Sequence, residues 1–184
     1  MVPIPWMVAM ALQADGWYLR SDIIWAKPNP MPESVTDRPT KAHEYLFLLS
    51  KAPRYYFDAD AVREGAATSE WPGIGPKHGT TDRHKSDYEP MAVNAGRNLR
   101  SVWTIATEPY PGAHFATFPR KLVEPCVKAG CPEGGTVLDP FAGSGTTLLV
   151  AQALGRRGIG IDLSPDYLRQ ALTRNSQTPM GLGA

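Results

Sequence analysis

One stretch decides the fold: Thr136-Val137-Leu138-Asp139-Pro140-Phe141-Ala142-Gly143-Ser144-Gly145-Thr146-Thr147. An apolar strand leads into a turn, Gly143 and Gly145 let the backbone pass close to a ligand, and a helix is predicted for 146–154. A second apolar strand follows and ends at Asp162, whose carboxylate can accept hydrogen bonds from ribose hydroxyls. This order predicts a pocket for an adenosine-type cofactor, although a GxG turn alone can also be a purely structural turn.

The residues around the turn exclude two common nucleotide-binding classes. Phosphate-cradling loops place a Lys before Ser or Thr, but Gly145 is followed directly by two threonines, which argues against an NTPase. Leu148 stands where the GxGxxG pattern needs a third glycine, which disfavours a nicotinamide enzyme. Asp139 would repel a pyrophosphate but suits the ammonium group of an amino-acid tail. These features together favour S-adenosylmethionine as the cofactor.

The chain resembles the S-adenosylmethionine-dependent DNA amino methyltransferases, in the permuted order in which the catalytic region precedes the cofactor loop. Residues 139–147 match the cofactor loop of that family, 160–167 look like its ribose-binding segment, and 114–119 are similar to the segment that crosses the methionine end of the cofactor. The resemblance implies an α/β, Rossmann-like methyltransferase fold. It also implies a set of residues around the cofactor: Asp139, Phe141, Gly143, Ser144, Gly145, Thr146, Asp162, Thr117 and Phe118.

One motif of the resembled family is missing from this sequence. Its members carry a polar-Pro-Pro-aromatic tetrapeptide that holds the target amino group and stacks on the flipped base, and no such tetrapeptide occurs here. The resemblance places it upstream of the helix that begins near Ile4, so we expect a permuted and incomplete domain with unknown catalytic residues. The strand that in the resembled fold lies between 136–139 and 18–26 should be absent as well. We therefore expect a gap in the sheet, and reduced stability or assembly with a second polypeptide.

The resemblance also indicates where DNA would bind. Residues 25–34 and 41–51 look like the strands and loop that face the target base, and Lys27, Arg38 and Lys41 are candidates for DNA contacts, with solvated loop charges as the alternative. Residues 65–100 are polar and basic, and are either a solvated insertion or a target-recognition segment. The expected single domain, 1–184, thus comprises base-facing strands (1–64), the insertion (65–100) and a cofactor-binding half (101–184).

The function implied is methylation of the exocyclic amine of adenine or cytosine in double-stranded DNA. A non-catalytic domain that binds S-adenosylmethionine and DNA and needs a separate catalytic partner is an alternative, and a methyltransferase acting on RNA, protein or a small molecule is a third. The two cysteines, Cys126 and Cys131, lack the further ligands of a zinc site. No apolar run approaches membrane-spanning length and no basic leader precedes an apolar stretch, so a cytoplasmic protein is expected.

Composition and periodicity predict the remaining elements. With 184 residues, 42% of them hydrophobic, the chain can bury one core, and its net charge of +1 does not by itself indicate a nucleic-acid partner. His43 is interpreted as a structural residue rather than a base. The proline-rich loop 27–40 and the cofactor turn are expected to border one cleft. The predicted helices and strands are a helix over 5–14, strands over 18–26, 44–50 and 54–58, and a helix over 120–129.

Overall fold

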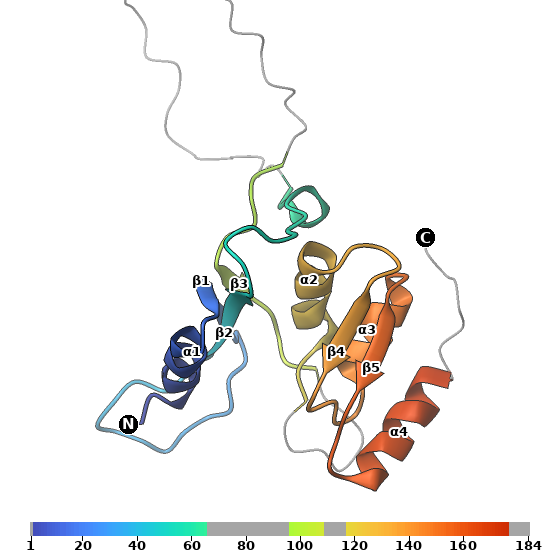
Figure 1. The fold of residues 1–184 in the computed structure, drawn as a ribbon. Helices are drawn as coiled ribbons and strands as arrows, with labels where there is room; N and C mark the ends of the chain where they lie inside the picture. Colours follow the sequence, from blue (N-terminus) through green and yellow to red (C-terminus); the bar gives the residue numbers. More distant parts are fainter. Residues whose placement is uncertain (1, 66–95, 109–116, 177–184) are drawn as a thin grey trace, which may run out of the picture.

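The structure is a computed structural model that describes residues 2–65, 96–108 and 117–176. Its first part is built on a sheet with the strand order β2-β1-β3 (Figure 1). Strands β1 (Tyr18–Ala26) and β2 (His43–Ser50) are antiparallel, and β3 (Val102–Thr104) runs parallel to β1. Helix α1 (Ile4–Ala14) packs on this sheet through Trp6, whose ring meets the ring of Phe47 edge-on at 4.9 Å between centroids.

The second part is a βαβ unit flanked by two further helices. Strands β4 (Thr136–Asp139) and β5 (Arg157–Gly160) are parallel, and helix α3 (Thr146–Ala153) makes the crossover between them. Helix α2 (Arg120–Gly130) precedes the unit and α4 (Pro165–Ser176) follows it. A parallel pair needs such a crossover because its two strands start at the same end of the sheet.

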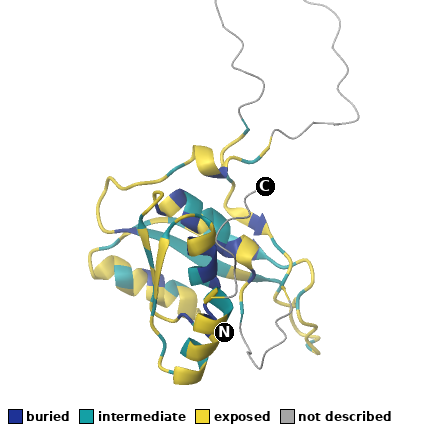
Figure 2. Ribbon diagram, turned by 90° about the vertical axis from the view of Figure 1, so that its right-hand side faces the viewer, coloured by how far each residue is buried: buried dark blue, intermediate teal, exposed yellow. Residues whose placement is uncertain are grey.

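Helix α2 contributes to the cores of both parts. Its Leu122 packs with Trp25 and Trp103 of the first sheet. Its Val123 and Val127 pack with α3 in the second core. The short helix η1 (Asp60–Val62) also lies against α2. Figure 2 shows the buried residues gathered in the interior, while much of the outer helix surface is exposed.

The structure confirms most of the predicted elements and corrects one. Strand 18–26 and the helices near 5–14, 120–129 and 146–154 are present, with ends shifted by at most one residue. The aromatic stretch 54–58 is not a strand. Its last residue, Asp58, donates its backbone N–H to the carbonyl of Ala129 in α2 at 2.9 Å and accepts a bond from the N–H of Ala61 at the start of η1. A run of aromatic residues is typical of a strand, but here the backbone N–H of Asp58 is bonded to α2, and its side chain to η1, rather than to a neighbouring strand.

The described strands form two separate sheets rather than one. Within 2–65, 96–108 and 117–176, no strand pairing joins β4-β5 to β2-β1-β3. The open face of the β4-β5 pair leaves Leu138 and Ile159 more than half exposed, at 59% and 53%. Parallel strands are normally covered on both faces, so part of this pair's surface is uncovered. No helix in the described ranges is long and apolar enough to cross a membrane.

Candidate cofactor site

The glycine turn between β4 and α3 adopts the backbone conformation that its two glycines allow. Gly143 has φ 49° and Gly145 has φ 76°, both in the left-handed region. Gly145 is the N-cap of α3 and supplies no side chain, so the first helical N–H groups receive no side-chain cap. The ladder between the strands continues beyond β4 and β5, since Ile161 donates to the carbonyl of Asp139 and Ala142 donates to the carbonyl of Ile161, each at 2.9 Å.

Asp162 ties the end of β5 to the glycine turn. Its Oδ2 accepts a hydrogen bond from the backbone N–H of Gly143 at 2.8 Å, and its Oδ1 accepts one from the N–H of Ser164 at 2.8 Å. The sequence predicted a ribose-binding role for this carboxylate but not this structural one. An ionised carboxylate has about four acceptor positions, so both roles are compatible.

Asp139 lies at the carboxyl end of β4, at the head of the same turn. Its Oδ1 accepts a hydrogen bond from the N–H of Phe141 at 3.0 Å, which fixes the start of the turn. The ring of Phe141 is 84% exposed, so it is available for contact with a ligand. Ser144 and Thr146, by contrast, are each only 5% exposed. The predicted loop residues therefore divide into exposed ones and ones that hold the loop.

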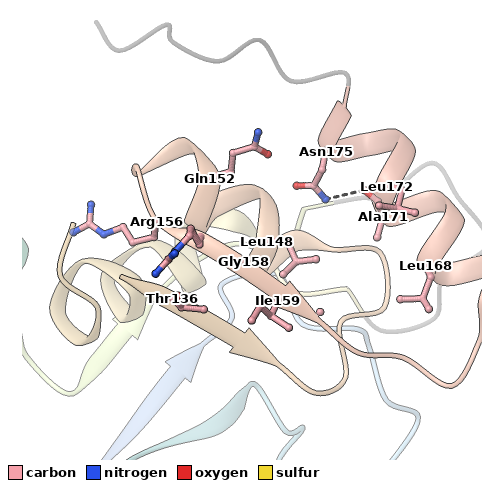
Figure 3. A pocket seen from close by; sticks show the side chains of 12 residues that line it. Thr136, Leu148, Gln152, Arg156, Gly158, Ile159, Leu168, Ala171, Leu172 and Asn175 are labelled. Carbon is pink, nitrogen blue, oxygen red and sulfur yellow. Dashed lines mark hydrogen bonds between the residues drawn. The ribbon is translucent and has the colours of Figure 1, made fainter. Parts of the chain in front are cut away.

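Leu148 takes the place of a third glycine without separating the helix from the sheet. A Cβ atom added to Gly158 would lie 2.9 Å from Leu148 Cδ2, and one added to Gly160 would lie 2.7 Å from Leu148 Cδ1. Figure 3 shows Leu148 reaching from α3 over the strand that carries Gly158. Glycines on β5 thus make room for a leucine on α3. In GxGxxG loops the small residue that permits close helix–strand packing lies on the helix side. Here the small residues lie on the strand instead, and close packing is still reached.

A cavity of about 650 Å³ connects the cofactor turn to the first sheet. It is lined by Asp139 and Phe141 of the turn, by Phe118 before α2, and by Glu44 and Tyr45 of β2. Phe118 thus lies at the cavity beside the turn, whereas Thr117 does not line it. The proline-rich loop 27–40, expected to border one cleft with the turn, does not line this cavity; the start of β2 does. Residues 114–116 lie outside the described ranges.

The three candidates for DNA contacts lie on the first part of the structure. Lys27 pairs with Glu44 and places its ammonium 4.5 Å from the ring centroid of Trp25. Arg38 pairs with Glu33 at 2.7 Å, and Lys41 is exposed. A DNA phosphate would have to compete with these carboxylates for Lys27 and Arg38. Most of the 65–100 insertion lies outside the described residues, so its basic side chains between 66 and 95 are not placed.

The base of the insertion is held by a group that sequence reasoning missed. Glu64 and Arg97 exchange two backbone hydrogen bonds of 2.9 Å, and the Glu64 carboxylate accepts bonds from Arg97 Nε at 2.6 Å and Arg100 Nε at 2.9 Å. Arg63 donates to the carbonyl of Gly96 at 2.9 Å. The backbone N–H of Arg100 and the Arg97 side chain hold the pKa of Glu64 below its ordinary value. The positions of Arg97 and Arg100 along the sequence give no signal that they contact Glu64.

We expect the Glu64 contacts to stabilise the fold in full only above pH 4.5, because 4.5 is the ordinary pKa of a glutamate and the pKa of Glu64 is lowered in the folded chain. The stabilisation is then fully present above 4.5 and is lost as the pH falls through the lower folded pKa. Thermal melts of the wild type and of Glu64→Gln test this. The two melting temperatures should differ near pH 7 and approach each other as the pH is lowered below 4.5; a difference that does not change with pH would contradict this expectation.

Substitution of Gly145 by alanine is expected to destabilise the chain by about 2–4 kcal/mol. The added Cβ would lie 2.8 Å from Ala171 Cβ on α4, and φ at this position is 76°. Gly130→Ala is the matched control, because no atom lies within 4 Å of its added Cβ. Urea unfolding of both variants measures the difference. Equal loss of stability in the two variants would show that neither the contact with α4 nor the left-handed backbone matters.

Comparison with known proteins assigns this chain to a family. The DNA methylase family model, N6_N4_Mtase, matches residues 3–173. The chain belongs to this DNA methylase family. It is 49% identical over 174 residues to the Type II methyltransferase M.SmaI of Serratia marcescens, covering 95% of this chain and 52% of that protein. It is 47% identical to M.Cfr9I of Citrobacter freundii, covering 95% of this chain and 50% of that protein. This DNA methylase chain thus spans about half the length of both relatives.

Solved structures confirm the fold of the DNA methylase chain. The cytosine-N4-specific PvuII DNA methyltransferase superposes with a TM-score of 0.65 at 20% identity, over 91% of this chain and 54% of that one. The M1.HpyAVI–SAM complex superposes with a TM-score of 0.60 at 24% identity, over 95% and 71%. The predicted α/β, Rossmann-like methyltransferase fold is therefore confirmed, as is the resemblance to the amino methyltransferases. The permuted order and the missing motif stay predictions.

Proposed function

We propose that this chain is part of a DNA amino methyltransferase and contains its cofactor-binding half; the enzyme transfers a methyl group from S-adenosylmethionine to the exocyclic amine of adenine or cytosine. The observation that carries the proposal is the position of Asp162, an acid at the end of β5 bonded to Gly143 of the glycine turn. The relatives are named Type II methyltransferases. By the same argument the whole protein would take part in restriction–modification and act in the cytoplasm.

The residues around the turn fit S-adenosylmethionine. Asp162 can accept hydrogen bonds from ribose hydroxyls, and Asp139 can attract the ammonium of the methionine tail. Phe118 and Phe141 supply apolar surface at the same cavity. When bound, the cofactor supplies a methyl group on a sulfonium. These residues provide both the carboxylates and the aromatic surface that S-adenosylmethionine requires.

This chain's part in the reaction is alignment rather than nucleophilic attack. Direct transfer to an amine needs the cofactor held in one orientation and a polar clamp on the amine. Asp139, Asp162 and the glycine turn provide the first requirement. The clamp belongs to the polar-Pro-Pro-aromatic motif, which this sequence does not contain. The target base must also leave the duplex, because a stacked base hides its amine.

A second polypeptide would supply the missing motif, and the cavity between the sheets supports this part of the proposal. The cavity touches Glu44, Tyr45 and Leu46 of β2 on one side and the whole of β4, residues 136–139, on the other. Because successive residues of a strand point to opposite faces, a cavity that touches consecutive residues runs along the strand edge. Among the described residues, β2 pairs with β1 alone and β4 with β5 alone, whereas β1, the strand expected beside the missing one, is already paired with β2 and β3. Two unpaired strand edges therefore border the same cavity.

The floor of this cavity is the apolar side of α2, with Leu122, Val123, Cys126 and Val127. A strand that enters here could bond to the open edges and place apolar side chains on α2, as in β-strand addition. The partner we propose is thus an extended, apolar segment followed by the polar-Pro-Pro-aromatic tetrapeptide. The relatives, about twice as long as this chain, have ample length for such a segment.

Double-stranded DNA is the proposed substrate. Lys27, Arg38 and Lys41 would contact its phosphates, and the 65–100 insertion, anchored by Glu64 and Arg97, would carry target recognition. In this proposal the single domain keeps the predicted division: base-facing strands at 1–64, the insertion at 65–100 and the cofactor half at 101–184. A non-catalytic domain that binds cofactor and DNA for a separate catalytic partner is the second candidate, favoured by the missing tetrapeptide.

The test is transfer of a labelled methyl group to DNA. The chain is incubated with labelled S-adenosylmethionine and unmethylated genomic DNA, alone and with the unmatched half of a relative, and the nucleosides are separated by mass. N4-methylcytosine or N6-methyladenine is the expected product when the unmatched half is present. Label in RNA or protein but not in DNA would refute the proposal. Methylation by the chain alone would exclude the non-catalytic alternative.

A further inference from the structure

The glycine turn has little conformational preference of its own. Its two left-handed glycines, Gly143 and Gly145, flank Ser144, and glycine loses more backbone freedom on ordering than any other residue. A ligand that needs one loop conformation would bind weakly unless other elements hold that conformation in advance. Asp162 restrains the Gly143 end of the turn. The Ser144–Thr146 end requires a second restraint.

Helix α4 provides this restraint through Arg174. The Arg174 Nη1 atom lies 3.3 Å from the carbonyl oxygen of Ser144, 3.2 Å from Ser144 Oγ and 3.1 Å from Thr146 Oγ1. A guanidinium can only donate, so all three oxygens act as acceptors toward it. Ser144 and Thr146 are each 5% exposed, which makes the loss of such donors costly. One side chain thus holds both neighbours of Gly145.

The rest of this part of α4 fits against the same turn. Ala171 and Asn175 lie where a Cβ on Gly145 would be, at 2.8 Å and 3.0 Å. Asn175 Nδ2 donates to the carbonyl of Ala171 at 2.7 Å, the bond drawn in Figure 3. Arg169, on the same helix, pairs instead with Asp166 and is largely exposed. The contact with the turn is therefore specific to one face of α4.

We propose that Arg174 is a positioning residue for the cofactor, which acts by fixing Ser144 and Thr146 of the glycine turn. This inference rests on the proposed function, because it takes S-adenosylmethionine as the ligand of the turn. Arg174 does not line the cavity that holds Asp139 and Phe141. It acts through the backbone and hydroxyl groups that it orders.

Arg174→Met keeps the apolar stem and removes every donor, and Arg169→Met is the matched control on the same helix. Calorimetry with S-adenosylmethionine should give at least about tenfold weaker binding for Arg174→Met and unchanged binding for Arg169→Met. Amide hydrogen exchange without ligand should become faster at 142–147 in Arg174→Met only. A purely structural role would lower the melting temperature and leave the affinity of the folded protein unchanged.

The outcomes separate the inference from the proposed function. Wild-type affinity in folded Arg174→Met, or unchanged exchange at 142–147, would overturn the role of Arg174 alone. A wild-type chain that does not bind S-adenosylmethionine would overturn the proposed function together with this role. If Arg174→Met does not fold, Arg174→Lys serves in its place. It keeps a charged donor but not the planar fork, so intermediate affinity is expected and wild-type affinity would contradict the role.

Discussion

Replacing Asp162 by alanine is expected to weaken S-adenosylmethionine binding at least about 100-fold. The substitution removes the acceptors for the N–H groups of Gly143 and Ser164 and the proposed acceptor for the ribose hydroxyls. The glycine turn would then be released from β5 as the direct ligand contact is lost. Calorimetric titration measures the affinity. Thermal melts establish that the variant is folded at the temperature of the titration.

Two matched variants show which part of Asp162 matters. Asp162→Asn retains one acceptor oxygen and should bind with intermediate affinity. Asp166→Ala removes an exposed carboxylate that pairs with Arg169, and should bind like the wild type. If folded Asp162→Ala bound within about threefold of the wild type, the assignment of this carboxylate to the cofactor site would be wrong.

Methyl transfer to DNA is expected only when this chain is combined with a polypeptide that carries the polar-Pro-Pro-aromatic motif. The unmatched half of M.SmaI is the natural choice, because the matched half is 49% identical to this chain. Neither polypeptide alone should methylate DNA, and the mixture should. The physical reason is the cavity bordered by β2 and β4, each of which has an edge without a strand partner in the part of the chain that the structure describes. The control is a partner in which the polar residue of the motif is replaced by alanine.

Cys126 reports directly on whether the partner enters the cavity. Its side chain lines the floor of the cavity and is reached by solvent, while the groups packed around its thiol desolvate it and raise its pKa to about 11, so its alkylation by a maleimide should be slow but measurable at pH near 9. Bound partner should slow this reaction at least about tenfold. Because Cys131 lines the same cavity, the reaction is followed in a Cys131→Ala variant, so that only Cys126 is labelled. Methylation by the mixture with unchanged Cys126 reactivity would place the partner elsewhere.

The sequence predicted the strand, turn and helix around Gly143 and Gly145 well because the signals for these elements are local. The turn, its flanking strand and helix, and Asp162 lie within 136–162, and each has a fixed backbone role. Leu148 illustrates the limit of pattern matching. A bulky residue at the third glycine position of a GxGxxG loop hinders close helix–strand packing, yet here Gly158 and Gly160 on β5 make the space for Leu148. Complementary changes on two elements are not visible in the spacing of one of them.

Other features could not be predicted because they depend on contacts between distant segments. Arg174 is an ordinary basic residue near a helix end, and only the fold brings it to Ser144, 30 positions away. Glu64 meets Arg97 across an insertion of polar residues. The stretch 54–58 has the aromatic content of a strand, but its Asp58 is bonded to α2 and η1. In each case the decisive partner is far along the chain or belongs to another element.

Calorimetric titration of the wild-type chain with S-adenosylmethionine, with ATP as a competitor, tests the central claim most directly. The account predicts saturable binding with one site per chain, which ATP does not displace. That result would establish that the turn held by Asp162 and Arg174 is a cofactor site. A folded chain that binds no S-adenosylmethionine, or whose binding is abolished by ATP, would contradict the assignment of residues 136–162 to this cofactor.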